Sequence, residues 1–232
     1  TVASAVGKGI FDVTERVVKV SAAATTAGAA AVSALTTLAV NSYANYEQLV
    51  GGVETLYKSS ADTVQKYAAI AYKTAGMSAN DYMETVTSFS AALVSSLAGD
   101  TAAAAELANT IVSDMSDNAN KFGTDMESVQ AVYNSLSKGQ FQTLDNLKLG
   151  YGGTKQEMQR LPDDANKLNA AQGRFTKYSI DNYADIANAI HDIQTEMDIT
   201  GTTAREASST IQGSTSAAKA AWSNLVTGVA DD

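Results

Sequence analysis

Histidine and cysteine are the side chains that most often bind zinc, and this chain offers little of either. His191 is its only histidine, and it contains no cysteine. Without an HExxH arrangement or paired thiolates, a zinc site is not expected. His191 directly follows Ile190, at the edge of an apolar helical stripe. We therefore interpret it as a side chain at the boundary of the core.

Carboxylates are more numerous, and four of them, Asp114, Asp117, Asp125 and Glu127, gather in one short stretch. Asp114 and Asp117 are three residues apart, a spacing that places two side chains on one face of a helix. Two such groups could act as a general acid and a general base. However, the sequence predicts no strand and loop that would fix the positions of these two carboxylates. We favour an acidic helix surface over a catalytic pair.

The glycine-rich residues 150–155, with the sequence GYGGTK, bear a superficial likeness to a phosphate-binding loop. That loop requires GxxxxGK[ST], in which the lysine reaches the phosphates and the next hydroxyl binds Mg²⁺. Here Thr154 precedes Lys155 and the spacing differs, so we predict a helix entry with a permissive backbone. No serine lies in a GxSxG elbow, and residues 135–138 lack the setting of a Ser-x-x-Lys nucleophile. The chain is predicted not to be an enzyme and to need no cofactor or metal.

The composition favours an all-α fold. Alanine supplies much of the 45% apolar content of the 232 residues, and alanine favours helix but fills little core volume. Pro162 is the single proline, whereas a β-rich chain of this size normally carries more turn residues. The formal net charge of −9 argues against non-specific binding to duplex DNA and against attachment to an anionic membrane.

Apolar residues recur at helical spacing from residue 43 onward. The pattern predicts a multi-helix bundle or stacked helical hairpins, preceded by a long N-terminal Ala-rich helix. We divide the chain accordingly into residues 1–42 and 43–232. The predicted helix N-caps are Ser78 or Asn80, Thr124 in a capping box with Glu127, and Thr154.

Two single residues carry further structural predictions. Pro162 is expected to break the helix that begins after Thr154 and to start a new one, because proline lacks the backbone N–H and disturbs the preceding turn. Trp222 lies at helical spacing with Ala218 and Leu225. Such a residue could serve an interface, but we favour packing in the core.

The first 40 residues carry a heptad seam, with apolar positions that alternate steps of four and three. Its positions are Val6, Ile10, Val13, Val17 and Val20, continued by Ala24, Ala27, Ala31, Ala34 and Leu38. Such a seam supports a left-handed coiled coil, and β-branched residues at both seam positions favour more than two strands, for example a trimer. The alternative is one long helix that packs on its own domain.

No charged residue lies between Lys19 and Glu47, a length that would suit a membrane-spanning helix. The content argues against a span, because alanine, serine and threonine predominate. Conditional insertion of residues 20–46 into a host envelope stays open as an alternative function, that of a membrane-active helical protein.

Several stretches resemble the core region of tail tape measure proteins of long-tailed bacteriophages and prophages. They are NYEQLVGGVETLYK (45–58), YKTAGMSANDYMETVTSFSAALVSSLAGD (72–100), VSDMSDNANKFGTDMESVQ (112–130), TLDNLKLGYGGTKQEMQRL (143–161) and AIHDIQTEMDITGTTAREASSTIQGSTSAAKAAWSNLVTG (189–228). Residues 1–42 are similar to the Ala-rich lead-in of such proteins. Pro162 departs from the family pattern, which would continue there as a helix.

The resemblance implies a structural virion protein, made in the bacterial host cytoplasm and located in the lumen of the virion tail. Proteins of this family set tail length, help to nucleate tail assembly with chaperones, and leave the tail during genome ejection. The implied partners are tail tube and tail-tip proteins, tail assembly chaperones and further copies of the chain. No specific nucleic acid is implied, and contact with the host membrane is an option at ejection.

The resemblance carries over no catalytic residues, and a cell-wall hydrolase is the less favoured enzymatic alternative. Because family members are long and this chain begins at Thr1 rather than Met, we expect it to be part of a longer protein.

The seam generates the first testable prediction. Replacing Val13 and Val17 with Asp places charges in the apolar interface, so self-association through the seam should be abolished. Sedimentation equilibrium of the full chain and of the double variant measures this. An unchanged mass in solution would contradict the proposed role of these residues.

Overall fold

The computed structural model of the protein describes residues 29–209 and 211–228. These residues form an all-α helical bundle with no strand, as the sequence predicted. The helices are α2 (Ala29–Tyr57), η1 (Lys58–Ser60), α3 (Ala61–Thr74), α4 (Ala79–Ser96), α5 (Thr101–Phe122), α6 (Met126–Leu136), η2 (Leu144–Leu147), α7 (Lys155–Ala171), α8 (Tyr183–Glu196), α9 (Thr202–Ser209) and α10 (Ile211–Thr227), where η denotes a 3₁₀ helix.

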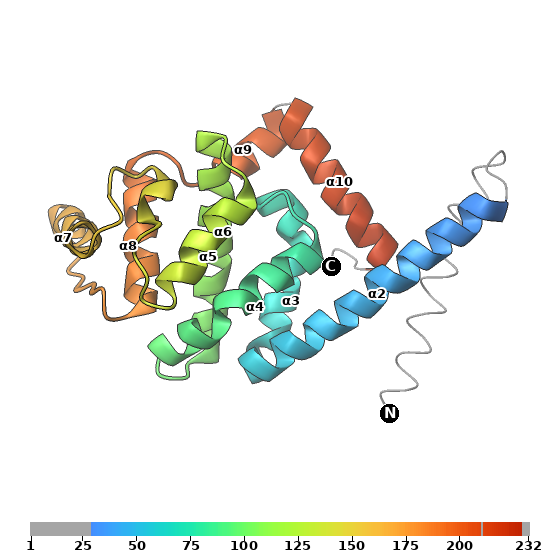
Figure 1. The fold of residues 1–232 in the computed structure, drawn as a ribbon, viewed down its shortest axis with the longest axis horizontal. Coiled ribbons are helices and arrows are strands. Elements are labelled where there is room, and N and C mark those ends of the chain that lie inside the picture. Colours follow the sequence, from blue (N-terminus) through green and yellow to red (C-terminus); the bar gives the residue numbers. More distant parts are fainter. Residues whose placement is uncertain (1–28, 210, 229–232) are drawn as a thin grey trace.

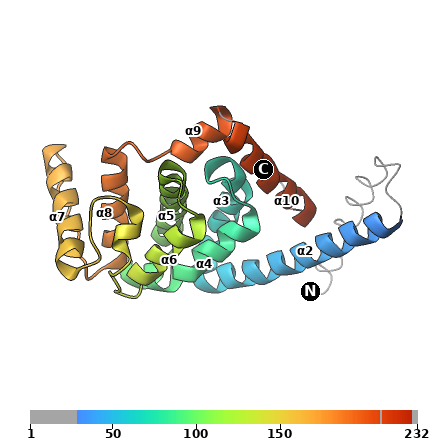
Figure 2. The ribbon, with the colours of Figure 1, turned by 45° about the horizontal axis from the view of Figure 1, so that its top comes forward.

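Helix α5 lies in the middle of the bundle (Figure 1). It contacts α2, α3, α4, α6, α8 and α9. Helices α7 and α8 pack side by side at one end, and α2 and α10 pack against each other at the other end (Figure 2). Helix α9 joins α8 to α10 across the far side of α5 from α4.

The predicted apolar stripes form the core. In α4 the side chains of Tyr82, Val86, Phe89 and Leu93 are all buried, at the spacing of one helix face. The hydroxyls of the buried Tyr57 and Tyr82 lie 2.7 Å from the Ser90 hydroxyl and 3.2 Å from the Asn109 side-chain oxygen, because a buried polar group is costly without a hydrogen bond.

Local capping chemistry sets several helix starts. Ser78 caps α4 in a capping box with Asp81, and the Thr154 hydroxyl accepts a hydrogen bond from the Glu157 N–H at the start of α7. Thr154 was the predicted cap of its helix, and Ser78 was one of the two predicted alternatives, the other being Asn80.

The predicted capping box at Thr124 is wrong, because Asp125 caps α6. Its carboxylate accepts hydrogen bonds from the Ser128 N–H at 2.8 Å and the Ser128 hydroxyl at 2.7 Å. Thr124 belongs instead to the end of α5, where Gly123 is left-handed and the Thr124 N–H returns to the Ala119 carbonyl at 2.9 Å. This Schellman-type ending places Thr124 one residue too early to be the cap.

The predicted helix break at Pro162 is also wrong, because α7 runs without interruption from Lys155 to Ala171. Pro162 is buried on the face that packs against the core. Ion pairs from Arg160 to Asp164 and from Lys167 to Asp164 connect the turns on either side of it. Burial of one face and these links offset the single backbone hydrogen bond that proline removes.

Helix α2 continues across the division between residues 42 and 43, and the division itself stays a prediction. The seam residues Val6, Ile10, Val13, Val17 and Val20 lie outside the part of the chain that the structure describes. Over the ranges 29–209 and 211–228, no helix combines the length and apolar character needed to cross a membrane.

The predicted core position of Trp222 is wrong, because 49% of the surface of this residue is exposed. Helix α10 instead buries Ala220, Asn224 and Thr227. Asn224 is tied to the body of the bundle, because its Oδ1 accepts a hydrogen bond from the Ala79 N–H at 2.8 Å. Small and polar residues allow α10 to approach α2 and α3 closely, so the indole points away from that contact.

The two candidate caps of α6 can be separated by substitution. Asp125→Ala removes the acceptor for the Ser128 N–H and should lower the thermal unfolding midpoint by a few degrees. Thr124→Ala removes no helix cap and should leave the midpoint nearly unchanged. Differential scanning calorimetry compares the two variants, and a larger loss for Thr124→Ala would contradict the assignment.

Candidate functional site

The strongest concentration of buried polar groups lies in one turn of α5, from Asp114 to Asn118. Asp114, Ser116, Asp117 and Asn118 are all buried, with Met115 among them. Five consecutive buried residues cover every direction around a helix, so this turn is enclosed by its neighbours. Each polar side chain must therefore find a partner on another element.

Asp114 pairs with His191 of α8. The His191 Nδ1 lies 2.9 Å from one carboxylate oxygen and 3.0 Å from the other. Asp114 is 1% exposed, whereas the side chain of His191 is 35% exposed. The predicted boundary position of His191 is confirmed, and its inner nitrogen is directed at a carboxylate 77 residues away in the sequence.

The pKa values of both groups are raised, but for different reasons. Burial raises the pKa of Asp114 to about 6, against the lowering effect of the hydrogen bond from His191 and with smaller raising effects of Asp117 and Asp192. The same hydrogen bond raises the pKa of His191. The folded protein thus holds protons here that the unfolded chain would release.

Asp117 and Ser116 bind the start of α9. The Asp117 carboxylate accepts hydrogen bonds from the backbone N–H of Gly201 at 2.6 Å and of Thr203 at 2.8 Å. Ser116 donates to the Ala75 carbonyl at 2.9 Å and lies 3.1 Å from the Thr203 hydroxyl. A carboxylate of α5 therefore caps a different helix and places negative charge at its positive end.

Asn118 completes the turn, because its amide donates to the Leu147 carbonyl of η2 at 2.9 Å. A second polar contact joins α7 to α8, where the Asn169 amide donates to the buried Asp192 carboxylate at 2.6 Å. The Gln194 amide of α8 reaches the Tyr133 hydroxyl at 3.3 Å. The buried polar side chains thus serve mainly to fix helices to one another.

The glycine-rich residues 150–155 form a turn whose backbone polar groups bond to side chains in the first turns of α7. The Arg160 guanidinium donates to the Gly150 carbonyl at 2.5 Å and lies 4.4 Å from the centre of the Tyr151 ring. The Gly152 N–H is bound by Glu157 at 3.2 Å. A Cβ at Gly153 would lie 2.3 Å from the Gln142 carbonyl oxygen, so only glycine fits. The predicted helix entry, rather than a phosphate site, matches this geometry.

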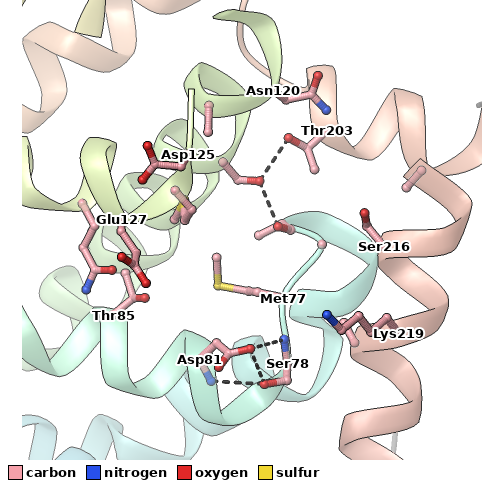
Figure 3. A pocket seen from close by; sticks show the side chains of 18 of the residues that line it. Met77, Ser78, Asp81, Thr85, Asn120, Asp125, Glu127, Thr203, Ser216 and Lys219 are labelled. Carbon is pink, nitrogen blue, oxygen red and sulfur yellow. Dashed lines mark hydrogen bonds between the residues drawn. The ribbon is translucent and has the colours of Figure 1, made fainter. Parts of the chain in front are cut away.

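An open cleft of about 1140 Å³ lies between the α3–α4 turn, the α5–α6 turn, α9 and α10 (Figure 3). Met77 points toward its centre, with Asp125 and Glu127 on one side and Lys219 and Ser216 on the other. We call it the acidic cleft, because five carboxylates line it: Asp81, Glu84, Asp125, Glu127 and Glu206.

Comparison of the chain with protein-family models, curated proteins and solved structures finds no match. The geometry of the site must therefore stand alone. In the part of the chain that the structure describes, no three histidine, cysteine, aspartate or glutamate side chains cluster in a way that could hold a metal ion.

The structure gives the four sequence-adjacent carboxylates different contacts, although Asp125 and Glu127 both line the acidic cleft. Asp114 pairs with His191, Asp117 caps α9, Asp125 caps α6, and Glu127 lines the acidic cleft. The predicted shared surface is wrong for Asp114 and Asp117, which are buried. The sequence did contain a signal, since Asp114 and Asn118, four residues apart, lie on one helix face beside the apolar Ile111 and Met115. It could not reveal which distant residues would satisfy them.

The raised pKa values of Asp114 and His191 predict that the stability of the folded protein depends on pH. Because both pKa values are raised in the folded state, stability should fall as the pH rises from about 4 to about 6, where Asp114 loses its proton, and should fall further as His191 loses its proton. The shift of Asp114 alone corresponds to a loss on the order of 2 kcal/mol between pH 4 and pH 7. Asp114→Asn retains an acceptor for Nδ1–H without a charge, so its stability should change less over this range.

Urea unfolding at several pH values measures this dependence, with Asp62→Asn, at an exposed position of α3, as the matched control. The control should follow the parent protein. An equally steep decline in Asp114→Asn would show that this pair does not govern the pH response.

Proposed function

We propose that the chain is the core region of a phage tail tape measure protein. In this role it acts inside the tail tube, helps to set tail length and nucleate assembly, and is released during genome ejection. The proposal rests on the five stretches that resemble this family, and it concerns a role through protein contacts rather than catalysis.

One structural observation carries the proposal: hydrogen bonds join all five resembling stretches into one core. Tyr57 and Ser90 bond through their hydroxyls at 2.7 Å, which joins residues 45–58 to residues 72–100. The α5 turn joins the other stretches, through Ser116 to Ala75, Asn118 to Leu147, and Asp117 to Gly201. The resemblance therefore covers a folding unit rather than scattered fragments.

The use of the carboxylates supports a structural role. A catalytic acid or base needs access to a substrate, whereas Asp114 and Asp117 are enclosed and bonded to other helices. The partners that the proposal implies are tail tube and tail-tip proteins, tail assembly chaperones and further copies of the chain. Its proposed location is the lumen of the virion tail, after synthesis in the host cytoplasm.

Quantitative mass spectrometry of purified phage particles tests this function. Particles are induced from the bacterium that encodes the chain, and peptides from residues 72–100 and 189–228 are measured against the major tail tube protein. We expect a few copies per tail in intact particles and a strong loss after DNA ejection. Absence of these peptides from intact tails would refute the proposal.

A further inference from the structure

The loop between α7 and α8 holds one aromatic side chain out in solvent. Phe175 is 91% exposed, far beyond what is usual for phenylalanine. It is flanked by Arg174 and Lys177, which are also exposed. We call residues 174–177 the basic hook.

The backbone on both sides of Phe175 is fixed. The Arg174 N–H donates to the Asn169 carbonyl at 2.8 Å. On the other side, the Asn166 side chain accepts hydrogen bonds from the Thr176 hydroxyl at 2.8 Å and from the Tyr178 N–H at 2.9 Å. An apolar anchor presented on a fixed backbone loses little conformational entropy on binding, which is the property of a good interface residue.

The acidic cleft offers the complementary surface. Glu84 of α4 and Glu127 of α6 are exposed at its edge, and Met77 and Met126 contribute adaptable apolar lining. The five lining carboxylates against Lys219 leave the cleft strongly negative, opposite in sign to the hook. Its volume of about 1140 Å³ is ample for an aromatic ring and the two cations beside it.

A chain cannot place its hook in its own cleft. The hook precedes α8, whereas α9, which lines the cleft through Thr203, follows it. The 14 residues of α8 hold these two regions roughly 21 Å apart. Figure 1 shows the α7–α8 connection and α9 at opposite ends of α8. The occupant must therefore come from another molecule, and every copy of this chain carries one.

We propose that the basic hook of one copy docks in the acidic cleft of a second copy, with Phe175 over the methionine lining and Arg174 and Lys177 beside the carboxylates. Two copies can dock reciprocally across a two-fold axis, which closes a dimer. They can also dock head to tail, which leaves one hook and one cleft free and lets growth continue to a closed ring or an open row. This inference is independent of the proposed function and of the N-terminal seam.

The test uses the full chain with Val13→Asp and Val17→Asp, which silence the seam, as the parent protein. A hook variant adds Phe175→Ser and Lys177→Glu, and a cleft variant adds Glu84→Lys and Glu127→Lys. Sedimentation velocity is recorded for each variant alone and for an equimolar mixture. Circular dichroism checks that helix content is unchanged.

The contact between hook and cleft predicts a specific set of masses. The parent should form a dimer or a larger assembly as its concentration rises toward about 1 mM, and each variant alone should be monomeric. The mixture should form dimers and nothing larger, because it contains one working hook and one working cleft per pair.

Matched controls change equivalent exposed residues elsewhere: Lys66→Glu with Met197→Ser for the hook, and Glu54→Lys with Asp145→Lys for the cleft. They should associate as the parent does. A monomeric parent, a variant that still associates alone, or a mixture without dimers would each overturn the proposal.

Discussion

The enclosure of one turn of α5 constrains the whole bundle. A helix that is buried on every side cannot send its polar side chains to water, so Asp114, Ser116, Asp117 and Asn118 take partners from surrounding elements. Those partners lie on α3, α8, α9 and η2. Apolar packing would bring the helices together in many arrangements of similar energy, whereas these directional bonds select one of them.

The same enclosure explains why carboxylates that could do chemistry serve structure instead. Asp114 is bonded to His191, and burial raises the pKa of the Asp114 carboxyl group. The Asp117 carboxylate accepts hydrogen bonds from backbone N–H groups at the start of α9. A buried charge that is compensated in this way holds helices in register, and removal of one partner would leave the other unpaired in a medium of low dielectric constant.

The surface shows a different arrangement, because charged and apolar side chains are exposed there. Phe175 is held away from the core by a loop whose own backbone is fixed. The acidic cleft concentrates carboxylates around methionine side chains. The bonded core of the bundle keeps both surfaces in position.

The sequence by itself determined the all-α class, the core faces of helices such as α4, and the cap at Thr154, and it narrowed the cap of α4 to Ser78 or Asn80, because these features depend on spacing within a few residues. Only the tertiary structure decided that Pro162 stays within α7, that Trp222 faces outward, and that Asp114 meets His191. Each of these outcomes depends on neighbours far away in the chain. Helical periodicity indicates which face of a helix is buried, but it does not indicate which other element packs against that face.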